Sequence, residues 1–565
     1  RVKSAEYNEL GKVVKEFLPN ETSVEYLYDS IGQLAKVLDQ NRHEINFNYN
    51  GFGLAAKRTA ENQLTSYLHN KNGMLSAVIS RFADQKQADR KIGYEYDDCD
   101  RLVRADYGKG QVETFQYNSW GKLIASSKVD ATAKRSATYA YDYFGRMVEK
   151  VETAVENGKT SKTVSRYAYN NYGQRTGRVT TADGVTFSEK REYDEFGRLA
   201  KIVSGSDTVT YAYNTKNQLV TRTTNGIAVR YSYTKLGQLA AKSIAGMEDA
   251  ASLKYFYDKD GTISGREVGG VKQSYKYDKI GQLLAVIDPA GKEVEKYVYD
   301  PAGNILSKTV AGKTTTYTYD KANQLVSSKN ADGKVTKYEY DAAGRMIKEG
   351  GTTFAYGCLD KVMQVAENGK TTQSYSYDIS GQLATADYGD SRETFLWDGL
   401  ALLSRNNLKY VNEPAVTGGN PILAGDKMLF DDMLGNTLGV KDGEKFSAID
   451  RDACGELKPG EKPNLAVNFF TGKPEIDGLG YSFLFRNYRA DLGKWQTTDP
   501  LGYPDGWNNL AYCNNQAFLT DPLGLSSFDD YDLSQLSSKD YGFVKHFYTG
   551  DGASVTLSQM GVFSA

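Results

Sequence analysis

The stretch that decides the fold is YKYDKIGQL, residues 275–283, which combines two tyrosines, a turn and the start of a returning strand. The same frame, Y-x-Y-D-x-x-G-[QR]-[LM], returns at residues 26–34, 338–346 and 375–383. Roughly eighteen such units, some degenerate, follow one another down to Trp397 at spacings of about 20 to 24 residues, and a period of that length is typical of a repeat architecture. The repeat also explains why 565 residues contain 42 tyrosines.

One unit, taken at residues 294–308, predicts a β-hairpin. The alternating stretch Tyr297-Val298-Tyr299 favours a strand over a helix. The turn DPAG, residues 300–303, follows, because Asp accepts hydrogen bonds from nearby backbone, Pro presets φ and Gly tolerates positive φ. The two tyrosines are two positions apart, so both rings face the same side of the strand. An isolated hairpin is marginal in water, so we expect neighbouring hairpins to stabilise one another.

The repeated tyrosines, glycines and turn acids are interpreted as structural. A calcium site at the turns is disfavoured because the acid is often replaced, as at Asn118, Asn170, Asn214 and Thr234, and because no second ligand follows at fixed spacing. The four cysteines lie far apart without a C-x-x-C pair, and the three histidines have no neighbouring ligand candidates. We therefore predict no metal and no cofactor.

Charge and hydropathy exclude other classes. The 69 Lys and Arg residues against 71 Asp and Glu give a formal net charge of -2 without a basic run, which disfavours nucleic-acid binding. No apolar run approaches the roughly 20 residues that a membrane span needs. Tyr7 already belongs to a repeat unit, so we expect the chain to begin inside the array, with any targeting segment upstream.

The repeat closely resembles the YD repeats of the Rhs family, which the C component of bacterial Tc toxins and, more distantly, the teneurins share. The resemblance implies an all-β fold in which a YD-repeat β-hairpin sheet spirals into a hollow, cocoon-like shell. A closed spiral would also protect the edges of so long a sheet. Residues 1–400 are expected to form this shell.

Beyond Gly399 the regular repeat spacing is lost. Residues 401–525 resemble the Rhs-associated core, which is expected to close one end of the shell. The match is strongest over residues 486–525, which contain RNY, LGKW, DPLG, NNLAY and a second DPLGL. Departures from the family pattern include Asn487, Lys494 and Gln516. None of them alters either D-P-x-G box.

The two boxes place Asp499 and Asp521 at the start of turns. A close pair of carboxylates can share one proton, so that one acts as a base on water and the other as an acid on the carbonyl. From this chemistry alone, a purely structural role in turns remains the alternative. Asp505 lies between the boxes and competes for a catalytic role, although Asp505-Gly506 is better interpreted as a turn.

The resemblance assigns the pair to an intramolecular aspartyl protease that cuts just after D-P-x-G-L. It implies cleavage between Leu525 and Ser526, with Arg486 holding one carboxylate ionised. Such an enzyme would act once, on its own chain, and we recognise no enzyme that turns over. Residues 526–565 are expected to be the start or remnant of a variable toxin segment, to which we assign no activity.

Three functions remain open. The first is a bacterial toxin carrier, used in competition between bacteria, that encloses its own C-terminal segment as cargo and cuts it free inside the shell. It would be secreted or delivered from the cell, with a capping or delivery protein upstream as a further partner. The second is a cargo-free extracellular adhesion or scaffold protein. The third, a carbohydrate-binding repeat protein, is weaker because the tyrosines are committed to stacking.

Overall fold

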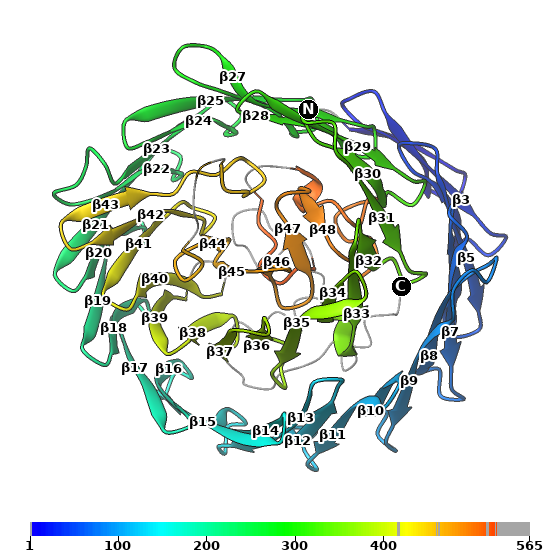
Figure 1. Ribbon diagram of the computed structural model, residues 1–565, viewed down its shortest axis with the longest axis horizontal. Coiled ribbons are helices and arrows are strands. Elements are labelled where there is room, and N and C mark those ends of the chain that lie inside the picture. Colours follow the sequence, from blue (N-terminus) through cyan, green and yellow to red (C-terminus); the bar gives the residue numbers. More distant parts are fainter. Residues whose placement is uncertain are drawn as a thin grey trace.

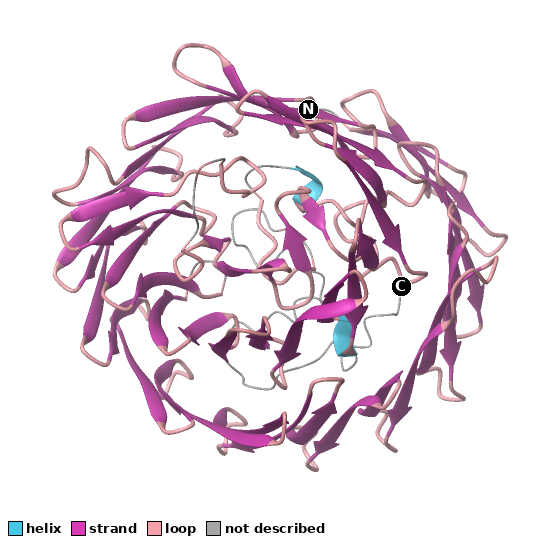
Figure 2. Cartoon of the chain, in the orientation of Figure 1, coloured by secondary structure: helices cyan, strands magenta, loops and turns pink. Residues whose placement is uncertain are grey.

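The computed structural model describes residues 3–414, 418–458, 460, 464–515, 519–525 and 527. Over these residues the chain is almost entirely β-structure, with two short 3₁₀ helices and no α-helix, as Figure 2 shows. Forty-three consecutive strands form one antiparallel sheet, and each strand pairs with the next along the chain. The predicted all-β hairpin sheet that spirals into a shell is confirmed (Figure 1).

The first thirty-one strands complete the outer turn of the spiral, and the last few of them already lie inside its first strands (Figure 1). Their bounds are β1 (Ser4–Tyr7), β2 (Val13–Phe17), β3 (Ser23–Tyr28), β4 (Leu34–Leu38), β5 (Glu44–Asn50), β6 (Gly53–Thr59), β7 (Gln63–His69), β8 (Leu75–Phe82), β9 (Arg90–Tyr96), β10 (Leu102–Gly108), β11 (Gln111–Tyr117), β12 (Leu123–Val129), β13 (Ala133–Tyr141), β14 (Met147–Glu156), β15 (Lys159–Tyr169), β16 (Arg175–Ala182), β17 (Val185–Tyr193), β18 (Leu199–Ser204), β19 (Asp207–Tyr213), β20 (Leu219–Thr224), β21 (Ile227–Tyr233), β22 (Leu239–Ile244), β23 (Ser252–Tyr257), β24 (Ile263–Val268), β25 (Val271–Tyr277), β26 (Leu283–Ile287), β27 (Glu293–Tyr299), β28 (Ile305–Val310), β29 (Lys313–Tyr319), β30 (Leu325–Lys329) and β31 (Val335–Tyr340).

The next twelve strands and the first 3₁₀ helix form an inner turn, and the last five strands and the second 3₁₀ helix form a separate core at the centre (Figure 1). The inner turn comprises β32 (Met346–Glu349), β33 (Thr352–Tyr356), η1 (Cys358–Asp360), β34 (Val362–Glu367), β35 (Lys370–Tyr377), β36 (Leu383–Asp387), β37 (Arg392–Asp398), β38 (Ala401–Arg405), β39 (Leu408–Glu413), β40 (Asn420–Ala424), β41 (Lys427–Asp431), β42 (Thr437–Asp442) and β43 (Lys445–Ala448). The core comprises β44 (Phe469–Phe470), β45 (Lys473–Ile476), β46 (Gly480–Ser482), β47 (Asn487–Arg489), β48 (Lys494–Trp495) and η2 (Cys513–Asn515).

Each hairpin closes through the chemistry of its turn. After β27, the Gly303 N–H donates to the Asp300 carbonyl at 3.0 Å, and the Asn304 N–H donates to Asp300 Oδ1 at 2.8 Å. Gly303 has φ +82°, which a residue with a Cβ rarely adopts. The residue types of the repeat therefore fix the turn, as the sequence predicts.

The second tyrosine of most units ties its hairpin to the preceding one. Its hydroxyl donates to the carbonyl of the residue that opens, or lies next to the start of, an earlier strand, as Tyr141 does to Leu123 at 2.8 Å. Each such bond contributes on the order of 1 kcal/mol, and together these bonds connect the successive hairpins of the sheet. The pairs are Tyr28–Val13, Tyr96–Leu75, Tyr117–Leu102, Tyr141–Leu123, Tyr169–Met147, Tyr193–Arg175, Tyr213–Leu199, Tyr233–Leu219, Tyr257–Leu239, Tyr277–Ile263, Tyr299–Leu283, Tyr319–Ile305, Tyr356–Met346 and Tyr377–Val362, with Trp397 Nε1 on Leu383 in the last unit.

Contacts between successive turns show that the spiral tightens. Near its start, Asn41 Nδ2 donates to Asp300 Oδ2 across 259 residues of sequence. Further along, Arg135 donates to Ser376 across 241 residues, and Lys242 pairs with Asp431 across 189. The number of residues in one full revolution thus falls along the chain. The inner turn accordingly lies inside the outer one (Figure 1).

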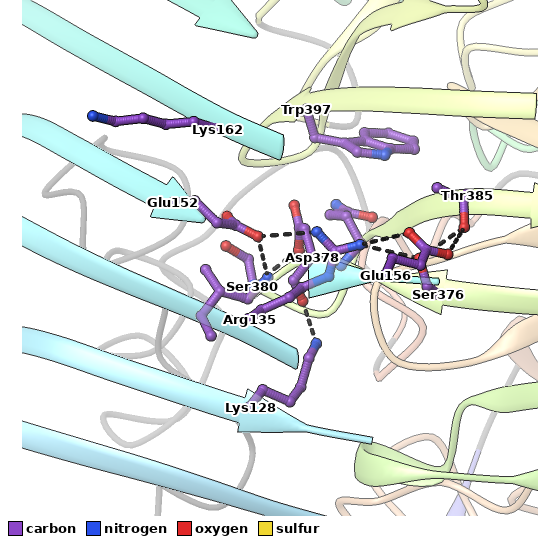
Figure 3. Close-up of polar contacts among 12 residues, drawn as sticks. Lys128, Arg135, Glu152, Glu156, Lys162, Ser376, Asp378, Ser380, Thr385 and Trp397 are labelled. Atoms are coloured by element: carbon purple, nitrogen blue, oxygen red, sulfur yellow. Dashed lines mark hydrogen bonds and ion pairs between the residues drawn. The ribbon is translucent and has the colours of Figure 1, made fainter. Parts of the chain in front are cut away.

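Buried charges fasten the two turns where β13 and β14 face β35 and β36 (Figure 3). Arg135 lies 3.5 Å from Glu152 and 3.0 Å from the Ser376 hydroxyl. Glu152 in turn accepts the Ile379 N–H at 3.0 Å. The pKa of Glu152 lies below its ordinary value because Lys150 and Arg135 outweigh the effect of burial. This part of the interior is therefore a network of paired charges.

The boundary placed at residue 400 stays a prediction. Strand pairing continues without a break past it, up to β43, and the separate five-stranded core follows. Among the described residues, no helix has the length and apolar character needed to cross a membrane. Apart from residue 527, the segment 526–565 lies outside the described residues.

Candidate active site

The three candidate catalytic residues meet in the central core. Arg486 lies between β46 and β47, at the end of a turn in which the Phe483 N–H donates to the Arg486 carbonyl at 3.1 Å. Asp499 and Asp521 open the two D-P-x-G boxes that follow β48. All three residues are buried.

One nitrogen of Arg486 contacts both carboxylates. Its Nη2 lies 2.7 Å from Asp499 Oδ2 and 3.1 Å from Asp521 Oδ2. The pair that the sequence predicts is therefore brought together, with the guanidinium between its members. Charge-assisted hydrogen bonds of this kind fix both distance and direction.

Other contacts hold the Arg486 side chain in place. Its Nε donates to the Gly524 carbonyl at 2.6 Å, and its Nη1 donates to the Asn509 carbonyl at 3.1 Å. The guanidinium also lies over the Trp495 ring, 4.1 Å from the centroid. A side chain bound on all these sides cannot swing away from the carboxylates, so the site is preorganised.

The second box has its own internal bonds. Asp521 Oδ1 accepts the Leu523 N–H at 3.3 Å, the Gly524 N–H at 2.8 Å and the Leu525 N–H at 2.9 Å. In the first box, the oxygen Asp499 Oδ1 accepts the Leu501 N–H at 2.8 Å. Backbone donors favour the ionised form of a carboxyl group, and Asp521 has more of them.

The two carboxyl groups differ in pKa. Burial raises the pKa of Asp521 to about 6, against the opposing effects of Arg486 and the backbone donors. Burial raises the pKa of Asp499 well above its ordinary value, and the charge of Asp521 adds to that rise. Burial thus favours the neutral form of both groups, and at this range the two carboxyl groups titrate as a coupled pair.

Leu525, on one side of the expected cleavage point, is 2% exposed and bound to Asp521 through its N–H. Ser526, on the other side, lies outside the described residues. A cavity of about 360 Å³ borders Asp499 and is lined also by Tyr67, Tyr503 and Trp507. Water therefore has room next to Asp499.

Three further residues belong to this environment. Asp505, interpreted from the sequence as a turn residue, binds Ser527. The Trp495 ring packs against the guanidinium of Arg486. In the sequence, only its place in the LGKW motif points to this residue. Lys473 is buried, and burial lowers its pKa to about 7 against the charge of Asp521. Among the described residues, no group of three or more His, Cys, Asp and Glu side chains is arranged to hold a metal ion.

Comparisons with known proteins agree with this architecture. The family model described as Teneurin YD-shell matches residues 270–395. No curated protein matches the chain in sequence. The structure resembles that of TcdB2-TccC3 without its hypervariable C-terminal region, with a TM-score of 0.51 and 13% identity over 92% of this chain and 35% of that one.

Two further solved structures are similar. TcdB2-TccC3-Cdc42 matches with a TM-score of 0.51, and TcdB2-TccC3 with a TM-score of 0.50. Both are 13% identical over 92% of this chain and 36% of theirs. This chain thus spans about a third of the length of the solved chains, and at this identity the likeness concerns the fold. The sheet, the matched family model and the fold likeness together show that the chain folds as a YD-repeat shell.

Proposed function

We propose that this protein is a toxin-carrying shell that cuts its own chain between Leu525 and Ser526. The cut frees the C-terminal segment, residues 526–565 and whatever follows them, inside the shell. The observation that carries the proposal is the buried pair Asp499 and Asp521 on one Arg486 nitrogen, with Asp521 also bound to the Leu525 N–H.

The chemistry is the hydrolysis of one peptide bond. The ionised carboxylate takes a proton from water, and the oxygen attacks the Leu525 carbonyl carbon while the protonated carboxyl group donates to the carbonyl oxygen. The tetrahedral intermediate then breaks the C–N bond, and the departing nitrogen of Ser526 takes up a proton. The products are a carboxyl group on Leu525 and an amine on Ser526, and one water is consumed.

The contacts and pKa shifts support one assignment of the two roles. Asp521 has the lower pKa of the pair and more backbone donors, which suits the base. Asp499 has the higher pKa, which suits the acid. Arg486 touches both carboxylates and lowers the pKa of each, which favours the ionised form that the base needs. We assign it the role of a positioning residue.

The same proposal extends to partners and location. The names of the similar solved structures join two components, TcdB2 and TccC3, and this chain spans about a third of them. We accordingly propose that further shell segments or a capping protein complete the enclosure around the cargo. The assembled particle would be secreted or delivered from a bacterial cell.

A cargo-free adhesion or scaffold shell is the second candidate. The observation that favours it is the matching family model, which is that of the teneurin YD-shell. Such a protein needs a stable sheet but no cut chain. The two candidates therefore differ in whether residues 526–565 leave the chain and stay enclosed.

The deciding experiment combines size-exclusion chromatography with a denaturing gel. The carrier predicts that the purified chain elutes as one species, which separates into a large and a small fragment only after denaturation. Asp521→Asn should elute at the same position and give a single band. A wild-type chain that remains whole after denaturation would favour the scaffold.

A further inference from the structure

A third carboxylate, Asp505, binds the chain just beyond the expected cut. The Ser527 N–H donates to Asp505 Oδ1 and Oδ2, each at 3.0 Å. The Ser527 hydroxyl donates to Asp505 Oδ1 at 2.9 Å. These lengths are those of good hydrogen bonds, and an ionised acceptor strengthens each of them.

The peptide that would be cut therefore lies between two anchored residues. On the near side, the Leu525 N–H binds Asp521, a member of the catalytic pair. On the far side, Ser527 binds Asp505. Fixing a reacting bond from both sides removes orientational freedom before the reaction, which is a large source of rate acceleration.

The bonds of Asp505 differ from those within the two boxes. Asp499 and Asp521 accept N–H groups from residues two to four positions further along the chain. These bonds close the turns that the two residues open. The bonds from Asp505 run instead to a residue 22 positions along the chain. These bonds are therefore not part of the Asp505 turn itself; they join it to the segment just beyond the expected cut.

We propose that Asp505 forms a substrate subsite that grips residue 527 by its N–H and its hydroxyl group and so positions the Leu525–Ser526 bond over Asp499 and Asp521. This inference rests on the proposed self-cleavage. The subsite takes a hydroxyl-bearing residue, serine or threonine, at the second position after the cut. Alanine there would retain the backbone bonds and lose the side-chain bond.

Asp505 also acts on the pair through its charge. It contributes to the raised pKa of both Asp499 and Asp521. The other titratable or charged groups of this environment are the guanidinium of Arg486, the buried Cys513 thiol, the Tyr512 hydroxyl and the buried Lys473 amine. Removing the charge of Asp505 should therefore lower the pH at which cleavage reaches half its maximal rate, which a merely structural residue would not do.

The test follows the rate of self-cleavage during cell-free synthesis of the whole chain, with samples denatured at intervals and fragment masses measured. We expect cleavage to slow on the order of 100-fold in Asp505→Ala and about tenfold in Ser527→Ala, from the lost bonds to a charged acceptor. Ser527→Thr should stay within about threefold of wild type, because threonine keeps the hydroxyl group. The double variant should be no slower than Asp505→Ala, because the two residues act through one contact.

Asp477→Asn is the matched control, since Asp477 is an exposed carboxylate of the same core, in the loop between β45 and β46. It should leave the rate and the pH profile unchanged, whereas Asp505→Asn should shift the acid limb to lower pH. Cleavage of Asp505→Ala at the wild-type rate and position, or multiplied losses in the double variant, would overturn the subsite. Should Asp505→Ala fail to fold, the Ser527→Ala and Ser527→Thr pair still decides. A wild-type chain that is never cut would instead overturn the proposed function itself, and the subsite with it.

Discussion

The YD turns of the shell and the D-P-x-G boxes of the core both use an aspartate side chain to bind the backbone that follows it, in two different environments. In the shell, Asp142 Oδ1 accepts the N–H groups of Phe144 and Arg146, both at 2.9 Å. In the core, Asp521 Oδ1 accepts N–H groups at the corresponding positions, those of Leu523 and Leu525. The side-chain oxygen thus plays a similar part in both turns, although the Gly524 N–H donates to Asp521 Oδ1 whereas the Gly145 N–H donates to the Asp142 carbonyl.

The second carboxylate oxygen shows the difference. Asp142 Oδ2 pairs with Arg146 of its own turn at 2.6 Å, and its pKa falls below its ordinary value. Asp521 Oδ2 pairs with Arg486 from another segment, and that arginine is shared with Asp499. In the dry core the pKa of Asp521 rises to about 6. We therefore expect an aspartate that is structural in a shell turn to share a proton when it is buried beside a second carboxyl group.

The largest expected effect comes from removing a carboxylate in each environment. Asp499→Asn should slow self-cleavage by at least about 10³-fold, because the acid of the pair is lost. Asp142→Asn should leave cleavage unchanged, because asparagine supports the same turn at Asn118 and Asn170. Denaturing gels over a time course measure both, with circular dichroism as the check on folding. Equal cleavage in the two variants would break the comparison.

Substituting the arginine that binds each aspartate should give a smaller difference in cleavage rate between core and shell variants. Arg486→Lys should slow cleavage on the order of 10²-fold, because lysine cannot reach both carboxylates and two carbonyls at once. Arg146→Lys keeps a half-buried pair within one surface turn and should change the free energy of unfolding by less than about 1 kcal/mol. Cleavage kinetics and denaturant titration give the two readouts. Full activity in Arg486→Lys would show that the shared guanidinium is unimportant.

The pH dependence follows from the raised pKa values of the core. Asp521 must be ionised to act as a base, so the rate should rise with pH and reach half its maximum near pH 6. It should fall again at higher pH, as Asp499 loses the proton that the acid must donate. Rates measured in buffers of constant ionic strength test this bell shape. A flat profile between pH 5 and pH 8 would contradict the assignment of base and acid.

The smallest effect concerns the tyrosine bonds of the shell. Tyr141→Phe removes the hydrogen bond to the Leu123 carbonyl and should destabilise the fold by about 1 kcal/mol. Cleavage should proceed at the wild-type rate, because the shell and the core perform separate tasks. Thermal melting and the cleavage assay on the same sample test both statements. Slower cleavage would mean that the stability of the shell affects the rate of the reaction in the core.

Local features were predictable from the sequence. The alternation of Tyr297 and Tyr299 and the turn at Asp300 specify a hairpin, because they depend on residues a few positions apart. The same holds for the two D-P-x-G boxes. Their pairing with Arg486 was an expectation from family resemblance, and the structure brings the three residues together, while their catalytic role stays a prediction.

Contacts between distant segments were not predictable. The pairing of Gln63 with Gln324, 261 residues away, depends on the pitch of the spiral, which no single repeat encodes. The bond from Asp505 to Ser527 depends on how the chain folds back after the second box. The Asp505-Gly506 sequence is typical of an ordinary turn, so it gave no indication of a contact with Ser527.

The most direct test of the central claim is the intact mass of the denatured wild-type chain beside that of Asp521→Asn. The account predicts two wild-type masses, one ending at Leu525 and one beginning at Ser526, and a single uncut mass for the variant. Identical spectra from the two proteins, whether both whole or both cut, would contradict it.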